Sequence, residues 1–241
     1  GKAGKTLAAK LSSQGKKVAL IEKSKSMYGG TCINIACIPT KTLIVAAEKG
    51  LDFEQAMNEK NAVTTRLNGK NYATIAGTGV DIIDATARFL SNKVIEIQAG
   101  DEKEELTAET IIINTGAVPT ILPIPGLAES KFAVDSTGIQ RLENLPKRLG
   151  VLGGGPIGLE FAHLYNTLGS KVTVLDASET FLPWIEPSIA ALAKGYLEED
   201  GIQFLQGVHT QEIKDGEASL TLVTDKGDFE FDILLYATGR K

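Results

Sequence analysis

The sequence predicts an α/β fold made of two three-layer domains, each with a mostly parallel sheet and an antiparallel β excursion. Strand and helix patterns alternate along the 241 residues. Glycine-rich turns that enter a helix occur twice, at the start of the chain and at residues 153–158. A hydrophobic content of 43% is enough to bury two modest cores.

The chain opens with a glycine-rich stretch, Gly1-Lys2-Ala3-Gly4-Lys5-Thr6, which enters a helical pattern and then a strand pattern ending in Glu22. A dinucleotide-binding fingerprint needs a strand before its glycines, and none precedes Gly1 in this sequence. We therefore expect the chain to start inside that motif, with Gly1 and Gly4 as its second and third glycines. Glu22 then takes the place of the acid that binds ribose hydroxyls.

A P-loop is the alternative interpretation of this stretch. Ala3-Gly4-Lys5-Thr6 has the Gly-Lys-Thr order that enters the helix of a phosphate-binding loop. That interpretation predicts an unrelated downstream strand ending in an acid that holds magnesium. It leaves the cysteines of the chain unexplained, so the dinucleotide interpretation is favoured.

Cys32 and Cys37 are the only two cysteines, and four residues separate them. A disulfide that closes so short a loop adds almost no stability, whereas a small, strained ring is easy to reduce and re-form. Two buried, reduced cysteines and a thiol metal clip are the alternatives, although zinc sites usually have tighter pairs and four ligands. The histidines, His163 and His209, lie far along the chain. The pair therefore indicates a redox switch beside a bound cofactor.

A strand, a glycine turn, a helix and a second strand ending in an acid follow one another between residues 148 and 176. This order is an intact dinucleotide-binding fingerprint, with an ordinary βαβ unit as the alternative. Gly153 permits the tight turn, Gly155 lets a pyrophosphate approach the helix N-terminus, and Gly158 packs the helix close to the strand. Asp176 would bind ribose hydroxyls and repel a 2′-phosphate, so we expect NADH, with NADPH less favoured.

Residues 29–41 resemble the active-site motif of the flavoprotein disulfide reductases, the family of glutathione reductase, lipoamide dehydrogenase and mercuric reductase. The motif is Gly-Gly-Thr-Cys, four residues, Cys, any residue, Pro, any residue, Lys, and it ends here at Lys41. Ala36 and Pro156 depart from many members, which have a glycine and a nicotinamide-covering tyrosine there. The amino-acid sequence around the cysteines is most similar to that of the bacterial branch associated with reactive chlorine resistance and hypothiocyanous acid reduction.

The resemblance implies a mechanism with bound FAD. Electrons would pass from NADH through flavin to the Cys32–Cys37 disulfide and on to a disulfide, hypothiocyanous acid or another reactive chlorine species. Cys37 would face the flavin and Cys32 would attack the substrate as a thiolate, favoured by a helix N-terminus and a cation. Glu160 would pair with Lys41 beside the flavin. The resemblance places cofactor contacts at Gly1, Gly4, Glu22, Lys23, Gly30, Thr31, Lys41, Ala87, Thr115, Gly116, Gly153, Gly155, Pro156, Ile157, Gly158, Glu160, Asp176 and Gly239.

The resemblance also divides the chain into domains. Buried-strand patterns that close on Thr-Gly, at 111–116 and 234–240, would end an FAD-binding domain and an NAD-binding domain, and a proline-rich crossing lies between. We expect the FAD-binding domain over 1–145 without its first strand, the NAD-binding domain over 146–238, and a return to the first domain from 239 to 241, with no dimerisation domain. Alternating stretches at 82–89, 94–97 and 220–223 predict the antiparallel excursions, and 42–67 is predicted to be helical.

The composition of the chain argues against some classes of binding partner. A net charge of −5 with interspersed signs argues against nucleic acid, and no apolar run or signal peptide suggests a membrane. Reactive thiols without structural disulfides fit the cytoplasm, and the full-length protein is expected to be a homodimer without a resident metal. A copper or mercury reductase, or a thiol metal-binding protein, would use the same cysteines. An inert fragment with exposed sheet edges is a further alternative.

Overall fold

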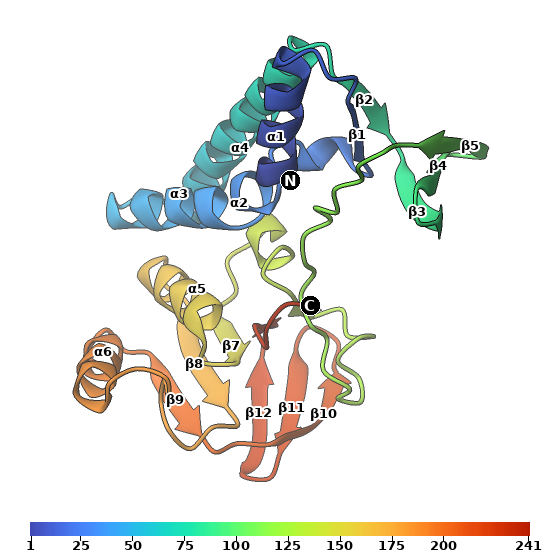
Figure 1. Cartoon of the computed structure of the whole chain (residues 1–241). Coiled ribbons are helices and arrows are strands. Elements are labelled where there is room, and N and C mark those ends of the chain that lie inside the picture. The colour runs from blue at the N-terminus through green and yellow to red at the C-terminus, as the bar shows by residue number, and fades with distance from the viewer. The chain divides into compact units, whose positions relative to one another are not determined.

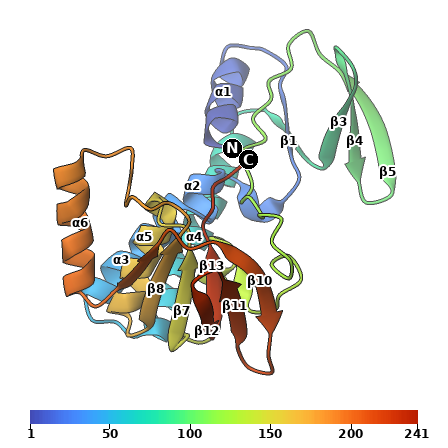
Figure 2. The same ribbon diagram turned by 90° about the horizontal axis from the view of Figure 1, so that it is seen from below.

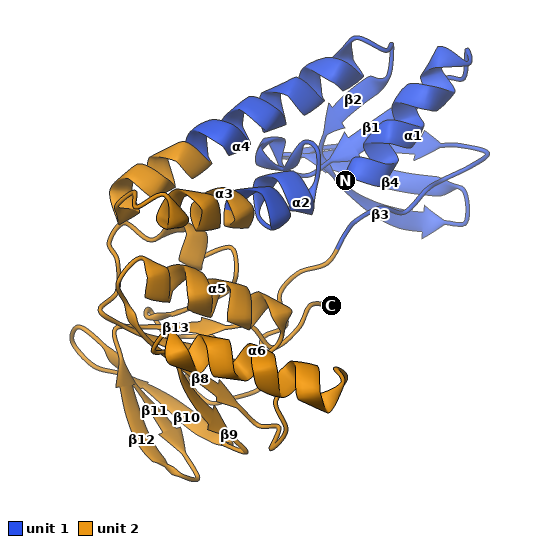
Figure 3. Cartoon of the chain, turned by 90° about the vertical axis from the view of Figure 1, so that its left-hand side faces the viewer, with its two compact units in different colours: residues 1–39, 61–116 blue, residues 40–60, 117–241 orange.

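The computed structural model describes residues 1–241 and forms two compact units (Figure 3). The first unit contains residues 1–39 and 61–116, and the second contains 40–60 and 117–241. Helices combine with parallel and antiparallel sheets, which confirms the predicted α/β class. The division into two cofactor-binding domains stays a prediction, because the units are defined by contacts within the chain.

The first unit combines helices with a parallel strand pair and an antiparallel sheet (Figure 1). Its elements are α1 (Lys2–Ser13), β1 (Ala19–Glu22), the 3-10 turn η1 (Lys25–Met27), α2 (Thr31–Asn34), β2 (Asp81–Asp84), β3 (Thr86–Ser91), β4 (Val94–Ala99) and β5 (Glu102–Thr107). Helices α3 (Cys37–Glu48) and α4 (Phe53–Ala76) contribute residues to both units. Strands β1 and β2 pair in parallel, while β3, β4 and β5 form an antiparallel sheet. Ala8, Tyr28, Ile75 and Val80 bury their side chains together.

The second unit is built on a five-stranded parallel sheet in the order β6-β13-β7-β8-β9. Figure 2 labels its strands β13, β7 and β8. Its elements are β6 (Ala133–Val134), the 3-10 turn η2 (Ile139–Arg141), β7 (Arg148–Leu152), α5 (Pro156–Thr167), β8 (Lys171–Asp176), α6 (Pro187–Glu199), β9 (Gln203–Gln206), β10 (Thr210–Asp215), β11 (Leu220–Thr224), β12 (Gly227–Phe231) and β13 (Ile233–Tyr236). The β7-α5-β8 order confirms the strand, turn, helix and strand predicted around the glycines.

Both faces of the parallel sheet are covered, as expected for strands with near-continuous apolar sequences. Leu149 and Val151 of β7 pack in one cluster with Phe161 of α5. Leu152 belongs to a second cluster with residues of the antiparallel sheet β10-β11-β12, among them Leu220. The second unit therefore has three layers, and the carboxyl ends of β7 and β8 lead into the predicted glycine turn and acid.

Residues 111–116 do not form the predicted buried strand. They pair with no strand, and Ile112 and Ile113 are 53% and 69% exposed. No strand of this structure lies beside the segment to supply ladder hydrogen bonds. An apolar run without a sheet partner does not form a strand.

Two other predicted segments are divided in the structure. Residues 82–89 were expected to be one antiparallel stretch, but Ala85 separates β2, which is parallel to β1, from β3. Residues 42–67 are helical as predicted except for a break between α3 and α4, where Gly50 has a φ of +78°. Such a positive φ favours glycine and ends a helix. The antiparallel strands at 94–97 and 220–223 are confirmed.

One window, Thr31–Glu48, has the length and a mean hydropathy of 1.2 that a membrane-spanning helix could have. It carries both cysteines and is divided between α2 and α3 by Ile35 and Ala36. Leu43 packs in the main cluster of the second unit. This window is weak evidence for a span, and the expectation that no segment crosses a membrane stays a prediction.

Asp232, between β12 and β13, anchors the start of β7. Its carboxylate accepts hydrogen bonds from the backbone nitrogen of Arg148 at 2.9 Å and from the guanidinium at 2.7 Å. Partial burial works to raise the pKa of Asp232, but the Arg148 hydrogen bonds outweigh it and hold that pKa below its ordinary value. The ion pair therefore stabilises the fold above the unfolded-state pKa of about 3.9, and this contribution is lost as pH falls through the folded-state pKa.

Asp232→Asn is expected to lower the unfolding midpoint at pH 7, and its difference from the wild type should shrink as pH falls below about 4. Urea unfolding between pH 7 and pH 3 measures both effects. Asp228→Asn, at an exposed position of β12, is the matched control and should change little. A wild-type advantage that is the same at pH 7 and pH 3 would contradict the assignment.

Candidate functional site

The glycines at the start of the chain lie against Asn114. Helix α1 begins at Lys2 with Gly1 as its N-cap, and the backbone nitrogen of Gly4 donates to Asn114 Oδ1 at 2.9 Å. A Cβ atom added to Gly1 or Gly4 would stand 2.7 or 3.0 Å from that oxygen. A side chain at Gly1 would therefore require Asn114 to move, and one at Gly4 would press tightly against it. Asn114 was missing from the predicted site, and its only signal in the sequence is its place before Thr115.

Gly30 and Glu22 approach the same turn. Gly30 has a φ of +85°, and a Cβ added to it would lie 2.8 Å from the Cα atom of Gly1. Glu22, at the end of β1, lies 4.0 Å from the backbone nitrogen of Gly1. An acid beside the N-terminus of a long helix is the arrangement that holds a ribose and a pyrophosphate. The first unit therefore brings together Gly1, Gly4, Glu22, Gly30, Thr31 and Gly116, whose Cβ position would be 3.8 Å from Thr31 Oγ1.

Three residues of the first unit that were predicted to contact a cofactor have exposed side chains. Lys23 follows Glu22, Ala87 lies in β3 opposite Ile97, and Thr115 lies in the irregular segment after β5. Their contacts with a cofactor stay predictions.

Cys32 lies in α2 and Cys37 is the first residue of α3, and both are reduced. Cys32 is half-buried and Cys37 is exposed. The pKa of Cys32 is raised, first because its thiol is hydrogen-bonded to Cys37 and then because it is partly buried. Lys2 and the backbone N–H of Ile38 lower that pKa by less. Lys2 therefore supplies the expected cation, but its effect on the pKa of Cys32 is smaller than that of the Cys37 hydrogen bond and burial. The structure contains the pair as two free thiols.

In the second glycine turn, other atoms lie close to the Cβ positions of two glycines, whereas the space at the third glycine is open. Gly153 has a φ of +104°, and an added Cβ would lie 2.8 Å from the carbonyl oxygen of Ala237. A Cβ at Gly158 would lie only 2.1 Å from the carbonyl oxygen of Gly153. Gly155, the N-cap of α5, has no atom within 4 Å of its Cβ position. Glycine at 153 and 158 is thus required by the fold, whereas the space at Gly155 is left for something else.

Asp176, the last residue of β8, hydrogen-bonds to the backbone of this turn. One carboxylate oxygen accepts from the backbone nitrogen of Gly154 at 2.6 Å, and the other accepts from that of Ser178 at 2.8 Å. The acid therefore lies beside the N-terminus of α5, at the carboxyl ends of the parallel strands, where open α/β sheets bind ligands.

Lys41 of α3 and Glu160 of α5 form the ion pair that the resemblance implied. Both side chains are half exposed, 58% and 44%, so the pair contributes little to stability by itself. Pro156 is the exposed first residue of α5, and Ile157 packs against the main core. Gly239 follows β13 with a φ of +105°.

No group of three or more His, Cys, Asp or Glu side chains is close enough to hold a metal ion. His163 lies 3.7 Å from Asp200, and the backbone nitrogen of His209 donates to Asp225. Neither histidine adds a ligand to the cysteines.

The comparison with family models matches the whole chain, residues 1–241, to the model described as pyridine nucleotide-disulphide oxidoreductase. The chain is 42% identical over 242 residues to the probable pyridine nucleotide-disulfide oxidoreductase RclA of Escherichia coli strain K12, covering 100% of this chain and 55% of that protein. It is 32% identical over 247 residues to a mercuric reductase of Bacillus cereus, covering 93% and 38% respectively.

The comparison with solved structures also finds flavoprotein disulfide reductases. The Cu(II) complex of the HOCl-induced flavoprotein disulfide reductase RclA from Escherichia coli matches with a TM-score of 0.98 at 42% identity, over 100% of this chain and 55% of that one. LpdA from Mycobacterium tuberculosis matches with a TM-score of 0.87 at 22% identity, over 100% and 56%, which speaks for the fold alone. The chain thus spans about half the length of several relatives it matches.

Proposed function

The chain belongs to the pyridine nucleotide-disulphide oxidoreductase family, and from this premise we propose that it is the cofactor-binding and redox part of an NADH-dependent flavoprotein disulfide reductase. The observation that carries the proposal is the hydrogen-bonded Cys32–Cys37 pair. It lies in the same unit as Gly30, whose backbone packs closely against the start of α1. The P-loop alternative is set aside, because the family match includes residues 1–6.

The residues around α1 fit FAD. Gly30 keeps side-chain atoms away from the start of α1, and Glu22 supplies an acid at the end of β1. The N-terminus of a 12-residue helix attracts a pyrophosphate. When bound, FAD would supply two-electron transfer between a nicotinamide and the cysteine pair. The Lys41–Glu160 ion pair lies within the second unit, and its role beside a flavin stays a prediction.

The cysteines would carry the two electrons to the substrate. Reduction of the Cys32–Cys37 disulfide takes up two electrons and two protons and leaves the dithiol that the structure contains. The Cys32 thiolate then attacks one sulfur of a disulfide substrate, and one half leaves as a thiol. Cys37 attacks the mixed disulfide, which releases the other half and restores the internal disulfide. Because the pKa of Cys32 is raised in the dithiol, this attack needs a base.

The substrate is proposed to be a small disulfide or a reactive chlorine species such as hypothiocyanous acid. The support is 42% identity to RclA, which is described with its solved structure as an HOCl-induced flavoprotein disulfide reductase. Reduction of Cu(II) or Hg(II) is the second candidate, favoured by the Cu(II) complex of RclA and by the mercuric reductases among the relatives. The whole protein is proposed to be a cytoplasmic homodimer.

The test is NADH oxidation by the FAD-loaded protein with one oxidant at a time: a small disulfide, hypothiocyanous acid, Cu(II) or Hg(II). Turnover with a disulfide or hypothiocyanous acid, and none with the metal ions, supports the first proposal. Turnover with a metal ion alone supports the second. Loss of both activities after alkylation of the two cysteines would assign either reaction to them.

Asp176→Asn is expected to weaken NADH binding by about tenfold and to improve NADPH binding relative to NADH. The amide removes the negative charge that would repel a 2′-phosphate, and it accepts fewer hydrogen bonds from the ribose and from Gly154. Titration of each nucleotide by calorimetry measures both affinities. Glu217→Gln, an exposed loop position with the same change of charge, is the control. Unchanged discrimination in the Asp176 variant would contradict this role.

A further inference from the structure

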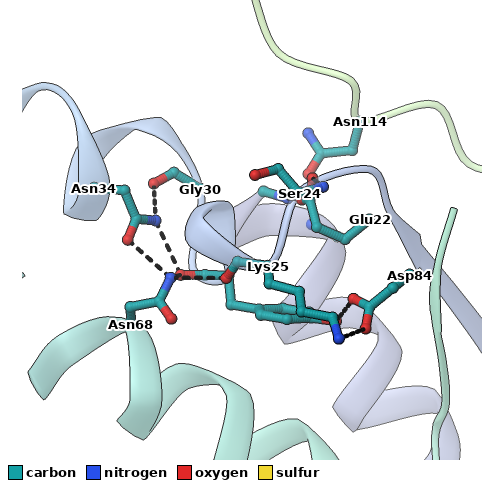
Figure 4. A network of polar contacts seen from close by, with 11 residues as sticks. Glu22, Ser24, Lys25, Gly30, Asn34, Asn68, Asp84 and Asn114 are labelled. Atoms are coloured by element: carbon teal, nitrogen blue, oxygen red, sulfur yellow. Dashed lines mark hydrogen bonds and ion pairs between the residues drawn. The ribbon is translucent and has the colours of Figure 1, made fainter. Parts of the chain in front are cut away.

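Two asparagine side chains hold the loop that precedes the cysteines. Asn34 Nδ2 donates to the carbonyl oxygens of Tyr28 at 2.9 Å and Gly30 at 2.8 Å. Asn68, on α4, donates through Nδ2 to Asn34 Oδ1 at 3.1 Å and lies 3.3 Å from the carbonyl oxygens of Lys25 and Tyr28. Figure 4 shows Asn68 reaching from α4 towards Asn34 and Lys25. We call Asn34 and Asn68 the amide clamp.

The hydrogen bonds of the amide clamp fix its orientation. Asn34 must point its nitrogen at two carbonyl groups, so its oxygen faces Asn68. The Asn68 nitrogen therefore meets three oxygen atoms, and a group without N–H donors has no favourable way to occupy that place. Asn34 ends α2, and Cys32 lies two residues before it in the same short helix. The hydrogen bond from Asn68 to Asn34 thus connects the helix that carries Cys32 to α4.

The same face of α4 supports the loop at two further points. A Cβ added to Gly29 would lie 2.9 Å from Asn71 Cγ, and the Tyr72 ring packs on the Tyr28 ring with centroids 4.9 Å apart. Positions 68, 71 and 72 are neighbours on one side of a helix. The Tyr28 hydroxyl donates to Asp84 of β2. Polar and ring contacts thus join the loop to α4, and Asn68 is the residue among these three that hydrogen-bonds to a side chain of α2.

We propose that Asn68 is a positioning residue for the Cys32–Cys37 pair. By orienting Asn34 it holds α2 so that the two thiols stay within hydrogen-bond reach, as they are in this structure. Holding two thiols together raises their effective concentration and favours the disulfide. The proposal rests on the proposed redox function of the pair. It assigns to α4, whose sequence shows no chemistry, a part in setting the reduction potential.

The test is the thiol–disulfide equilibrium of the chain with dithiothreitol, which needs no flavin. Oxidised dithiothreitol takes two electrons and two protons from Cys32 and Cys37, leaving the protein disulfide and reduced dithiothreitol. Alkylation and intact mass count the free thiols at each buffer ratio. Asn68→Asp, the same shape with an oxygen in place of the donor, is expected to lower the equilibrium constant for the protein disulfide at least about fivefold. Asn61→Asp, exposed on α4, is the control and should not change it.

A second variant, Asn68→Ala, covers the case in which Asn68→Asp does not fold. It removes the donor without adding repulsion, so a smaller shift in the same direction is expected. A lower melting temperature with an unchanged equilibrium constant, in whichever variant folds, overturns the proposal, because it shows a structural role alone. A wild-type chain that forms no reversible disulfide overturns the proposed function as well, so the two failures are distinguishable.

Discussion

Cys37→Ser is expected to reduce NADH-driven reduction of a small disulfide by the FAD-loaded protein to background, a loss of at least about a thousandfold. A hydroxyl can neither form the internal disulfide nor resolve the mixed disulfide with substrate. Because the chain has only two cysteines, no other thiol can replace it. The measurement is the rate of thiol release under anaerobic conditions.

Cys32→Ser should lose the same turnover but differ in its spectrum. The proposal places Cys37 against the flavin, so its thiolate remains in the Cys32 variant and should produce a long-wavelength absorption band that Cys37→Ser lacks. Circular dichroism of both variants checks that each is folded. Turnover retained by either single variant would contradict a mechanism through the pair. A band present in Cys37→Ser and absent from Cys32→Ser would reverse the two roles.

Gly158→Ala and Gly155→Ala are expected to fail in different ways. The methyl group at Gly158 would overlap the Gly153 carbonyl oxygen, at 2.1 Å, so α5 must move from β7. We expect a loss of about 3 kcal/mol of unfolding free energy. The methyl group at Gly155 meets open space, and its φ of −77° suits alanine, so stability should change by less than about 0.5 kcal/mol. The same methyl group would block a pyrophosphate and weaken NADH at least about tenfold.

Urea unfolding and NADH calorimetry on both variants separate these effects. A stable Gly155→Ala protein that binds NADH as tightly as the wild type would mean that the space at Gly155 does not receive the nucleotide. A Gly158→Ala protein of wild-type stability would mean that the turn yields easily, and the fold would then not explain the glycine there.

Local patterns predicted the β7-α5-β8 segment of the second unit. The β7-α5-β8 segment combines buried strands, a glycine turn and an apolar helix face within 29 residues, from Arg148 to Asp176, so its order could be inferred without long-range contacts. The Lys41–Glu160 pair was inferred from resemblance alone, because the two residues are 119 positions apart in the sequence.

Features that depend on distant partners were missed. Ile112 and Ile113 have the composition of a buried strand, yet a strand needs a neighbour, and periodicity does not report whether one exists. Asn114 and Asn68 contact residues 110 and 34 positions away, respectively Gly4 and Asn34. Asparagines in a loop and in a helix give no sign of such partners, because their side-chain hydrogen bonds follow from tertiary structure.

The most direct test of the central claim is to trap the cysteines after NADH is added to the FAD-loaded, oxidised protein without oxygen. A maleimide label and mass analysis then show whether electrons reached the pair. The account predicts no label before NADH and two labels after it, on Cys32 and Cys37, the only thiols of the chain. Flavin that is bleached by NADH while both cysteines stay unlabelled would show that electrons stop at the flavin, and would contradict the account.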